Sequence, residues 1–329
     1  MRRPARRFFL IGLLTATLSM ALWRNRWESH PTALKAYSSR LENTSPIIGF
    51  DDASFQDASF ALIIPFAGWQ SDLVLRNIQD VWSRWPPCFL PRMHSTDLYI
   101  YYHQDITKSD HLIPLLRSAF LKHANVSSCF KTIQFLNAGL SDANDVYPLA
   151  AARMFFKLFK SSKLIRYPAM YYMEPDNIPC KQGWLDQLFR ESRVPGGFWV
   201  RGKFVESLRK SGSIIRDRDP VTGQYPYSQH INGNALYAIG DADFRSFVSH
   251  IVEPAFWGDP DEFLGGYDVA LYMIRQNRTL ISWIYYTETI HLFQYTSLIQ
   301  NLYRTPGNSS LICDEFPKTY LVHGREVVW

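Results

Sequence analysis

Several signatures of common enzyme classes are missing from this sequence of 329 residues. It contains no Gly-x-Gly-x-x-Gly fingerprint of dinucleotide binding, no phosphate-binding P-loop and no Gly-x-Ser-x-Gly elbow of hydrolases. It also lacks internal repeats and low-complexity tracts. These absences argue against dehydrogenase, kinase and serine hydrolase chemistry.

Cysteine is scarce, and the four cysteines do not show the C-x-x-C spacing of a zinc or redox site. An even number is expected for one or two disulfides formed in an oxidising compartment. The spacing allows three connectivities and selects none of them. The cysteines are Cys88, Cys129, Cys180 and Cys313.

Positive charge is in excess only at the N-terminus. The net charge is +5, but six of the 35 basic residues are arginines within the first 26 residues, where no acidic residue occurs. The remainder carries 29 basic residues against 30 acidic ones and has no basic block. The sequence therefore predicts no nucleic-acid partner.

The apolar segment 8–23 carries no charge, follows four arginines and precedes only Arg24 and Arg26. A typical transmembrane span has about 17 to 25 residues, so this segment is slightly short. Its length suits the membranes of the early secretory pathway, which are thinner than average. The excess of arginines before the segment predicts a type II signal-anchor in the Golgi or ER membrane, with the rest of the chain in the lumen. A cleaved signal peptide, with Ser19 and Ala21 before the cut, is the alternative.

The predicted organisation is a cytoplasmic tail at 1–7, a transmembrane helix at 8–23, a polar stem at 24–58 and one lumenal domain at 59–329. Four N-x-Ser/Thr sequons predict a glycoprotein, because such sites are used only on lumenal surfaces. The sequons begin at Asn43, Asn125, Asn277 and Asn308.

Within the lumenal domain, short apolar runs alternate with amphipathic stretches, which predicts strands alternating with helices. Such alternation predicts an α/β fold with a mostly parallel sheet flanked by helices and ligands at the carboxyl ends of its strands. The second half extends the same sheet. Strands are expected at 60–64, 97–102, 130–136, 169–173 and 230–238, and helices from 71 and at 112–123, 148–159, 241–251 and 266–275.

The segment 169–177 reads Ala-Met-Tyr-Tyr-Met-Glu-Pro-Asp-Asn, a hydrophobic strand that ends in two carboxylates. Residues at i and i+2 of an extended chain point the same way, so Glu174 and Asp176 can both face one divalent, oxygen-seeking cation. Near the C-terminus, Thr319-Tyr-Leu-Val-His-Gly predicts a short strand that presents His323. A neutral imidazole is a good Mn²⁺ ligand beside carboxylates.

In these features the chain resembles nucleotide-sugar glycosyltransferases of the GT-A type, which have a Rossmann-like sheet. Their Asp-x-Asp motif ends a central strand and holds Mn²⁺ or Mg²⁺ against the donor diphosphate, and several of these families add a late histidine. The resemblance implies metal ligation by Glu174, Asp176 and His323, although Glu-Pro-Asp departs from the family's motif in the reach of its first carboxylate.

The stretch Asp261-Glu-Phe-Leu-Gly-Gly-Tyr-Asp precedes an expected helix. GT-A enzymes that invert configuration use a carboxylate in this part of the chain as the general base, which the resemblance assigns to Asp268 and, as second choice, Glu262. Asp268 could equally cap the helix, and a retaining enzyme would need no such base.

Two further sets of residues are candidates for binding the donor or acceptor. Asn232 and Asn234 lie on a Gly-interrupted extended run and could bind sugar hydroxyls, or serve only in a turn. Arg153 and Lys157 lie one helical turn apart and could neutralise donor phosphates, or simply face solvent.

Together these features predict transfer of a sugar from a nucleotide-sugar, of the UDP-sugar type, to a hydroxyl of a glycan or glycoprotein. Two rivals remain open. One is a non-catalytic lectin-like or scaffold protein of the same fold. The other is a lumenal glycoside hydrolase, which would hold two carboxyl groups about 5 to 9.5 Å apart across a cleft.

Overall fold

The structure is a computed structural model, and it describes residues 60–91, 95–109, 111–204, 207–208, 214–215, 230–263, 265–276, 288–302, 307–324 and 327–328. All of them belong to one compact unit, Asp52–Trp329. The expected tail, transmembrane helix and stem, at 1–58, lie outside the described residues. Within the described part of the chain, no helix is both long and apolar enough to cross a membrane.

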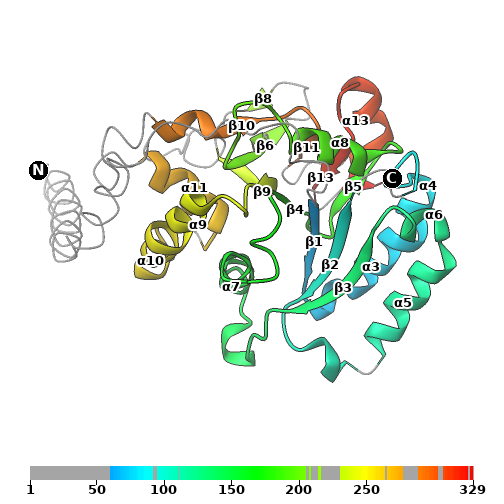
Figure 1. Ribbon diagram of the computed structural model, residues 1–329, viewed down its shortest axis with the longest axis horizontal. Helices are drawn as coiled ribbons and strands as arrows, with labels where there is room; N and C mark the ends of the chain where they lie inside the picture. Colours follow the sequence, from blue (N-terminus) through cyan, green and yellow to red (C-terminus); the bar gives the residue numbers. More distant parts are fainter. Residues whose placement is uncertain are drawn as a thin grey trace, which may run out of the picture. The chain divides into compact units, whose positions relative to one another are not determined.

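A seven-stranded sheet forms the centre of this unit, in the order β10-β6-β9-β4-β1-β2-β3 (Figure 1). Parallel pairs join β1 to β2 and β4, β2 to β3, and β6 to β10. Among the described strands of this sheet only β9 is reversed, and it lies antiparallel to β4 and β6. The predicted mostly parallel α/β sheet is confirmed. Its strands are β1 (Phe60–Phe66), β2 (Thr96–Tyr102), β3 (Thr132–Asn137), β4 (Met170–Tyr172), β6 (Val200–Phe204), β9 (Ile231–Tyr237) and β10 (Phe293–Tyr295).

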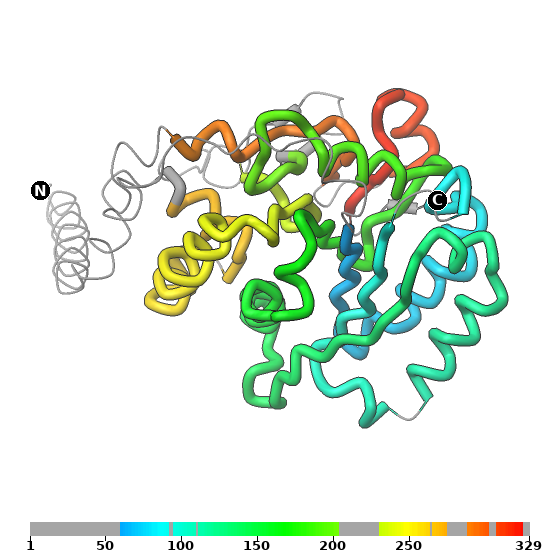
Figure 2. The backbone as a smooth tube through the Cα atoms, viewed as in Figure 1, coloured from blue at the N-terminus to red at the C-terminus, as the bar shows by residue number. Residues whose placement is uncertain are grey.

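Helices flank the sheet on both faces (Figures 1 and 2). On one face α3 packs against α5, and on the other α7 packs against α11, which also contacts β9. Two helices contain π-helical segments, Asn77–Val81 between α3 and α4 and Val248–Val252 between α9 and α10. The helices are α3 (Ser71–Arg76), α4 (Trp82–Arg84), α5 (Leu112–Lys122), α6 (Ala124–Ser127), α7 (Leu149–Phe159), α8 (Trp184–Glu191), α9 (Ala242–Phe247), α10 (Glu253–Gly258), α11 (Tyr267–Gln276) and α13 (Ser309–Glu315).

The core between α7, α11 and the sheet is aromatic. Phe155 of α7 is fully buried and stacks on Tyr267 of α11, with ring centroids 4.0 Å apart and planes 14° from parallel. The same ring contacts Tyr172 of β4 and Tyr237 of β9 at centroid distances of 5.7 and 5.1 Å. Each such pair contributes about 0.5 to 1.5 kcal/mol beyond the burial of its area. The cluster holds β4, β9 and α11 together at Tyr172, the last residue of β4.

A second, three-stranded sheet has the order β11-β13-β5. It joins the segment after β4 to the C-terminal region, because β13 lies parallel to β11 and antiparallel to β5. Its strands are β5 (Asn177–Pro179), β11 (Ile299–Asn301) and β13 (Leu321–His323). Two further sheets consist of two strands of two residues each: β7 (Ser207–Leu208) with β8 (Ile214–Ile215), and β12 (Gly307–Asn308) with β14 (Val327–Val328).

Two disulfides use all four cysteines of the chain. Cys88 pairs with Cys129, and Cys180 pairs with Cys313. The second bond ties the residue that follows β5 to α13, and it links two cysteines 133 residues apart in the sequence. The structure thus selects one of the three connectivities that the spacing allowed.

Candidate metal centre

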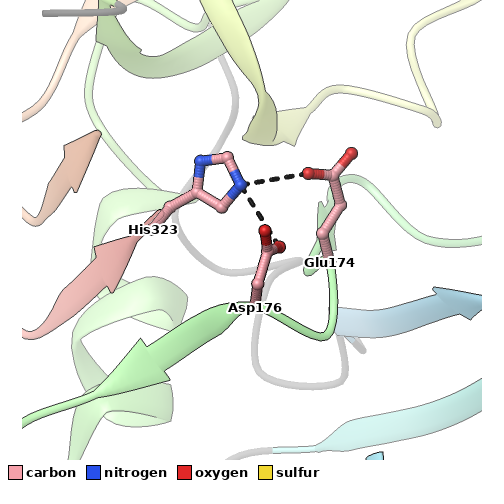
Figure 3. Close-up of side chains that lie close together, drawn as sticks. All are labelled: Glu174, Asp176 and His323. Atoms are coloured by element: carbon pink, nitrogen blue, oxygen red, sulfur yellow. Dashed lines mark ion pairs between the residues drawn. The ribbon is translucent and has the colours of Figure 1, made fainter. Parts of the chain in front are cut away.

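Glu174, Asp176 and His323 converge at the carboxyl end of β4 (Figure 3). The His323 Nε2 atom lies 3.2 Å from Glu174 Oε2 and 3.3 Å from Asp176 Oδ1. One potential ligand atom from each residue falls within 4.8 Å of the others. The side chains are 31, 24 and 15 % exposed, respectively, so an ion could reach them from solvent. The structure therefore brings the three predicted metal ligands together.

The strand pairing explains how residues far apart in sequence meet here. Glu174 and Asp176 lie in the short connection between β4 of the central sheet and β5 of the second sheet. Since β13 runs antiparallel to β5 with His323 opposite Asn177, the end of β13 lies beside the start of β5. A backbone hydrogen bond from Gly324 N–H to the Asp176 carbonyl oxygen, at 3.5 Å, extends this pairing to the ligand itself.

The charge of His323 depends on the two carboxylates. Burial alone lowers the pKa of this imidazole, but attraction to Asp176, with hydrogen bonds to Asp176 and Glu174, raises it to about 10. Without a cation, His323 is therefore protonated at neutral pH and bridges the two acids. Two carboxylates and an imidazole are the donor set that Mn²⁺ accepts, and Mg²⁺ suits the carboxylates. The residues present thus fit a divalent ion in place of that proton.

Asn234 of β9 holds Glu174 at two points. Its Oδ1 atom accepts a hydrogen bond from the Glu174 backbone N–H, and its Nδ2 atom donates to Glu174 Oε2, both at 2.8 Å. Asn232 Oδ1 accepts from the backbone and side-chain N–H groups of Asn234 at 3.0 Å. Asn234 is fully buried. These two predicted sugar-binding residues lie at the metal centre, while their contact with sugar stays a prediction.

Asn301 of β11 contacts the third ligand. Its Oδ1 atom lies 3.1 Å from His323 Nδ1, and its Nδ2 atom donates to the Lys203 carbonyl oxygen at 2.8 Å. Asn301 was not predicted from the sequence. His323 ends the apolar run Tyr-Leu-Val, whereas Asn301 follows Gln300 in the strand Ile-Gln-Asn, which has no such run to mark it.

Asp268, the first candidate for the general base, lies in the first turn of α11 next to β9. Its Oδ2 atom accepts from the Gly233 backbone N–H at 3.1 Å and lies 3.3 Å from His230 Nε2. Burial raises the pKa of Asp268, but the charge and hydrogen bond of His230 lower it further, and the net shift is downward. Gly233 directly precedes Asn234, whose side-chain amide binds Glu174. Neighbouring residues of β9 therefore contact Asp268 and Glu174. His230 was not singled out from the sequence.

The other candidates lie apart from this cluster in the contacts that the structure describes. Glu262 is exposed in the turn before α11, where its backbone N–H donates to Asp259 Oδ1 at 3.3 Å. The Arg153 guanidinium stacks on the Trp257 ring, 4.3 Å from its centroid. Lys157 Nζ donates to the Ala138 carbonyl oxygen. The base role of Glu262 and the phosphate-binding roles of Arg153 and Lys157 stay predictions.

A second buried histidine joins the loops that follow β1 and β2. His103 Nε2 accepts a hydrogen bond from Gly68 N–H at 3.0 Å, and its Nδ1 atom lies 2.6 Å from Asp145 Oδ2. The arrangement fixes the turn Gly68–Gln70, in which Trp69 is 77 % exposed. The carboxyl end of the sheet therefore presents an ordered loop beside the one that carries Glu174 and Asp176.

No known protein family matches the sequence, and no curated protein does so either. Among solved structures, the chain is similar to the crystal structure of mouse xyloside xylosyltransferase 1 in its apo form, with a TM-score of 0.42 and 12 % identity. The match covers 81 % of this chain and 98 % of the mouse protein. A likeness this remote carries no argument about the site, which depends on the geometry above.

Proposed function

We propose that this protein is a metal-dependent glycosyltransferase of the GT-A type. It would transfer a sugar from a nucleotide-sugar, of the UDP-sugar type, to a hydroxyl of a glycan or glycoprotein. The observation that carries the proposal is the convergence of Glu174, Asp176 and His323 at the carboxyl end of a central parallel strand. That edge of an open α/β sheet is where ligands bind.

The residues of the centre have distinct parts in this proposal. Glu174, Asp176 and His323 would hold Mn²⁺ or Mg²⁺, and the bound ion would supply positive charge against the departing diphosphate. Without a cation, the two carboxylates would repel a diphosphate, so donor binding would depend on the metal. Asn234 holds Glu174 at its backbone N–H and its carboxylate, which fixes one side of the centre.

Asp268 is the proposed acceptor-side residue. Its carboxylate is ionised at neutral pH, as a general base must be, and the lowering of its pKa by His230 makes it a weaker base than an unpaired aspartate. His230 and the Gly233 N–H orient it toward β9. In an inverting reaction it would take the proton from the acceptor hydroxyl, and in a retaining reaction it would only position the acceptor.

The glycoside hydrolase is disfavoured by the same geometry. Its two carboxyl groups act from opposite sides of a sugar, about 5 Å or more apart. Here the carboxylates follow one strand and share a single imidazole between them. Such a pair suits a shared cation better than two separate roles around a sugar ring.

We also propose that the chain acts in the lumen of the Golgi or ER, on the predicted type II anchor. Two disulfides that use every cysteine support an oxidising compartment. The exposed sequon residue Asn125 is compatible with a glycosylated surface. Nucleotide-sugar donors are used, and glycan acceptors are modified, in that compartment.

The test is donor turnover by the purified full-length protein. We expect hydrolysis of at least one nucleotide-sugar in a panel to require Mn²⁺ or Mg²⁺. Asp176→Ala should lower kcat/KM by at least about 100-fold. Loss of a residue that only supports a metal ligand already costs about 10- to 100-fold, and Asp176 is proposed as a direct ligand. Asp314→Ala, which removes an exposed carboxylate on α13, is the matched control. Turnover that ignores both metal and Asp176 would overturn the proposal, and absence of donor binding would favour the lectin-like or scaffold protein.

A further inference from the structure

The imidazole of His323 can serve as a ligand through only one of its two nitrogens at a time. In a neutral imidazole one nitrogen carries the hydrogen and the other has the lone pair. Both carboxylates of the centre face Nε2, at 3.2 and 3.3 Å. Nε2 is therefore the nitrogen that a shared cation would contact, and the hydrogen must then lie on Nδ1.

The side chain opposite Nδ1 is Asn301. The two residues are register partners in the parallel pair β11–β13, and Asn301 Oδ1 lies 3.1 Å from His323 Nδ1. Asn301 is 2 % exposed, so water does not compete for this contact. An amide oxygen can only accept, and it thus favours the form of His323 that carries the hydrogen on Nδ1.

The orientation of the Asn301 amide is set from its other end. Its Nδ2 atom donates to the backbone carbonyl oxygen of Lys203 at 2.8 Å. A carbonyl oxygen cannot donate, so a flipped amide would place two oxygens against each other. Lys203 belongs to β6 of the central sheet. Two successive contacts, from Lys203 to Asn301 and from Asn301 to His323, therefore connect the imidazole to the central sheet.

We propose that Asn301 is a positioning residue that fixes the Nδ1–H form of His323 and so presents the Nε2 lone pair to the divalent cation. The inference rests on the proposed metal centre and extends it to a residue that does not touch the ion. Outer partners of metal-binding histidines typically contribute about 10- to 100-fold in affinity.

The test is Mn²⁺ alone, titrated into the purified full-length protein and followed by the electron paramagnetic resonance of free Mn²⁺. Asn301→Leu should weaken Mn²⁺ binding by about 10- to 100-fold. Asn301→Asp keeps an acceptor toward His323 but sets its second oxygen against the Lys203 carbonyl, so it should bind Mn²⁺ more tightly than Asn301→Leu and more weakly than the unmodified protein. Gln300→Leu is the matched control, because Gln300 is a buried amide on the same strand that bonds to Thr319 Oγ1 at 3.2 Å. It should bind Mn²⁺ like the unmodified protein.

A double-mutant cycle separates positioning from general structural support. If Asn301 acts through His323, then Asn301→Leu should cost nothing further once His323→Ala has been made. An equal loss of affinity in both backgrounds would overturn the inference, and so would Asn301→Leu binding as tightly as the unmodified protein. If Asn301→Leu does not fold, Asn301→Ser takes its place in the cycle. Failure of the unmodified protein to bind Mn²⁺ would overturn the metal centre itself, a distinct outcome.

A spectroscopic readout checks the tautomer directly. With ¹⁵N-labelled histidine and diamagnetic Mg²⁺, the long-range ¹H–¹⁵N spectrum should show the His323 hydrogen on Nδ1. Comparison with the His323→Ala protein identifies its signals. A hydrogen on Nε2 in the Mg²⁺-loaded protein would overturn the proposal.

Discussion

His323 lies between two carboxylates, where a proton and the proposed divalent cation would compete for the same nitrogen. Its pKa, raised from 6.5 to about 10, means that the proton stays bound until the pH rises through about 10. A cation must displace that proton, so at every pH below about 10 its affinity should increase about tenfold for each unit by which the pH rises. Mn²⁺ affinity measured by calorimetry should therefore rise steeply between about pH 6 and about pH 8. Affinity that does not change over this interval would contradict the prediction.

His323→Gln is the control for that pH dependence. It keeps a polar side chain beside Glu174 and Asp176 but has no group that titrates in the range. Mn²⁺ should bind more weakly to this variant, and the steep rise with pH should be lost. If the rise persists, then another group sets the slope.

At the level of residues, the sequence predicted the convergence of Glu174 and Asp176 because the two carboxylates follow one hydrophobic strand, whereas His323 was added from a separate short strand and the GT-A resemblance. Local spacing brings Glu174 and Asp176 to the same side without knowledge of the fold. The residues that contact these side chains could not be predicted from local spacing. Asn301 reaches His323 through the pairing of β11 with β13, and His230 reaches Asp268 from the residue before β9. Both contacts depend on the pairing and packing of elements that local periodicity does not encode.

At the level of elements, β9 approaches α11 unusually closely at Gly233. A Cβ atom at this position would collide with the hydroxyl group of Tyr267. Tyr267 cannot easily move, since its ring is buried and stacks on Phe155. Gly233→Ala should therefore reduce the free energy of unfolding by about 1 to 3 kcal/mol, the usual cost of overpacking a core. Urea denaturation monitored by circular dichroism measures this change.

Gly258→Ala is the matched control for Gly233→Ala. A Cβ atom at Gly258, the last residue of α10, would meet no heavy atom within 4 Å. Alanine is favoured over glycine in a helix by about 0.5 to 1 kcal/mol, so this variant should be as stable as the original or slightly more so. Equal destabilisation by the two substitutions would show that glycine itself, and not the Tyr267 contact, is responsible.

The elements that the sequence predicted well are those with long and regular apolar patterns. β1 and β2 are buried along their whole length, as expected for strands covered on both faces, and α5 and α7 end within one residue of their expected bounds. The second sheet was not predicted as a unit. Its strands have three residues each, too few for a period of two to stand out, and its stability comes from pairing between distant segments.

At the level of the whole molecule, the proposed lumenal location predicts N-linked glycans at the described sequons. Asn308 caps α13 through Oδ1, which accepts from Ser310 and Leu311 N–H at 2.9 and 3.2 Å. A glycan is attached at the other amide atom, Nδ2, so the cap and the modification are compatible. Full-length protein from secretory cells should therefore migrate faster after treatment with a glycosidase. Unshifted protein would count against the glycosylated lumenal domain.

Replacing Asn308 separates the glycan from the cap. Asn308→Asp removes the glycan site but keeps an oxygen that can cap α13, whereas Asn308→Ala removes both. We expect both variants to lose the same glycan and only Asn308→Ala to lose an additional 0.5 to 2 kcal/mol, approximately, of unfolding free energy. Thermal unfolding of the deglycosylated proteins measures the difference. Equal stability of the two variants would show that the cap contributes little.

The two disulfides constrain the chain over very different distances. Cys180–Cys313 spans 133 residues, and Cys88–Cys129 spans 41. In the chain-entropy description, removing the longer cross-link should destabilise the protein by about 1 kcal/mol more than removing the shorter one. The longer bond also follows β5, where Cys180 N–H donates to the Tyr320 carbonyl oxygen at 3.0 Å just before the strand of His323. Cys180→Ser with Cys313→Ser should therefore weaken Mn²⁺ binding as well as stability, while Cys88→Ser with Cys129→Ser should lower stability alone. Guanidinium denaturation and Mn²⁺ titration of both double variants test this, and equal Mn²⁺ affinity in the two would mean that strand pairing alone positions His323.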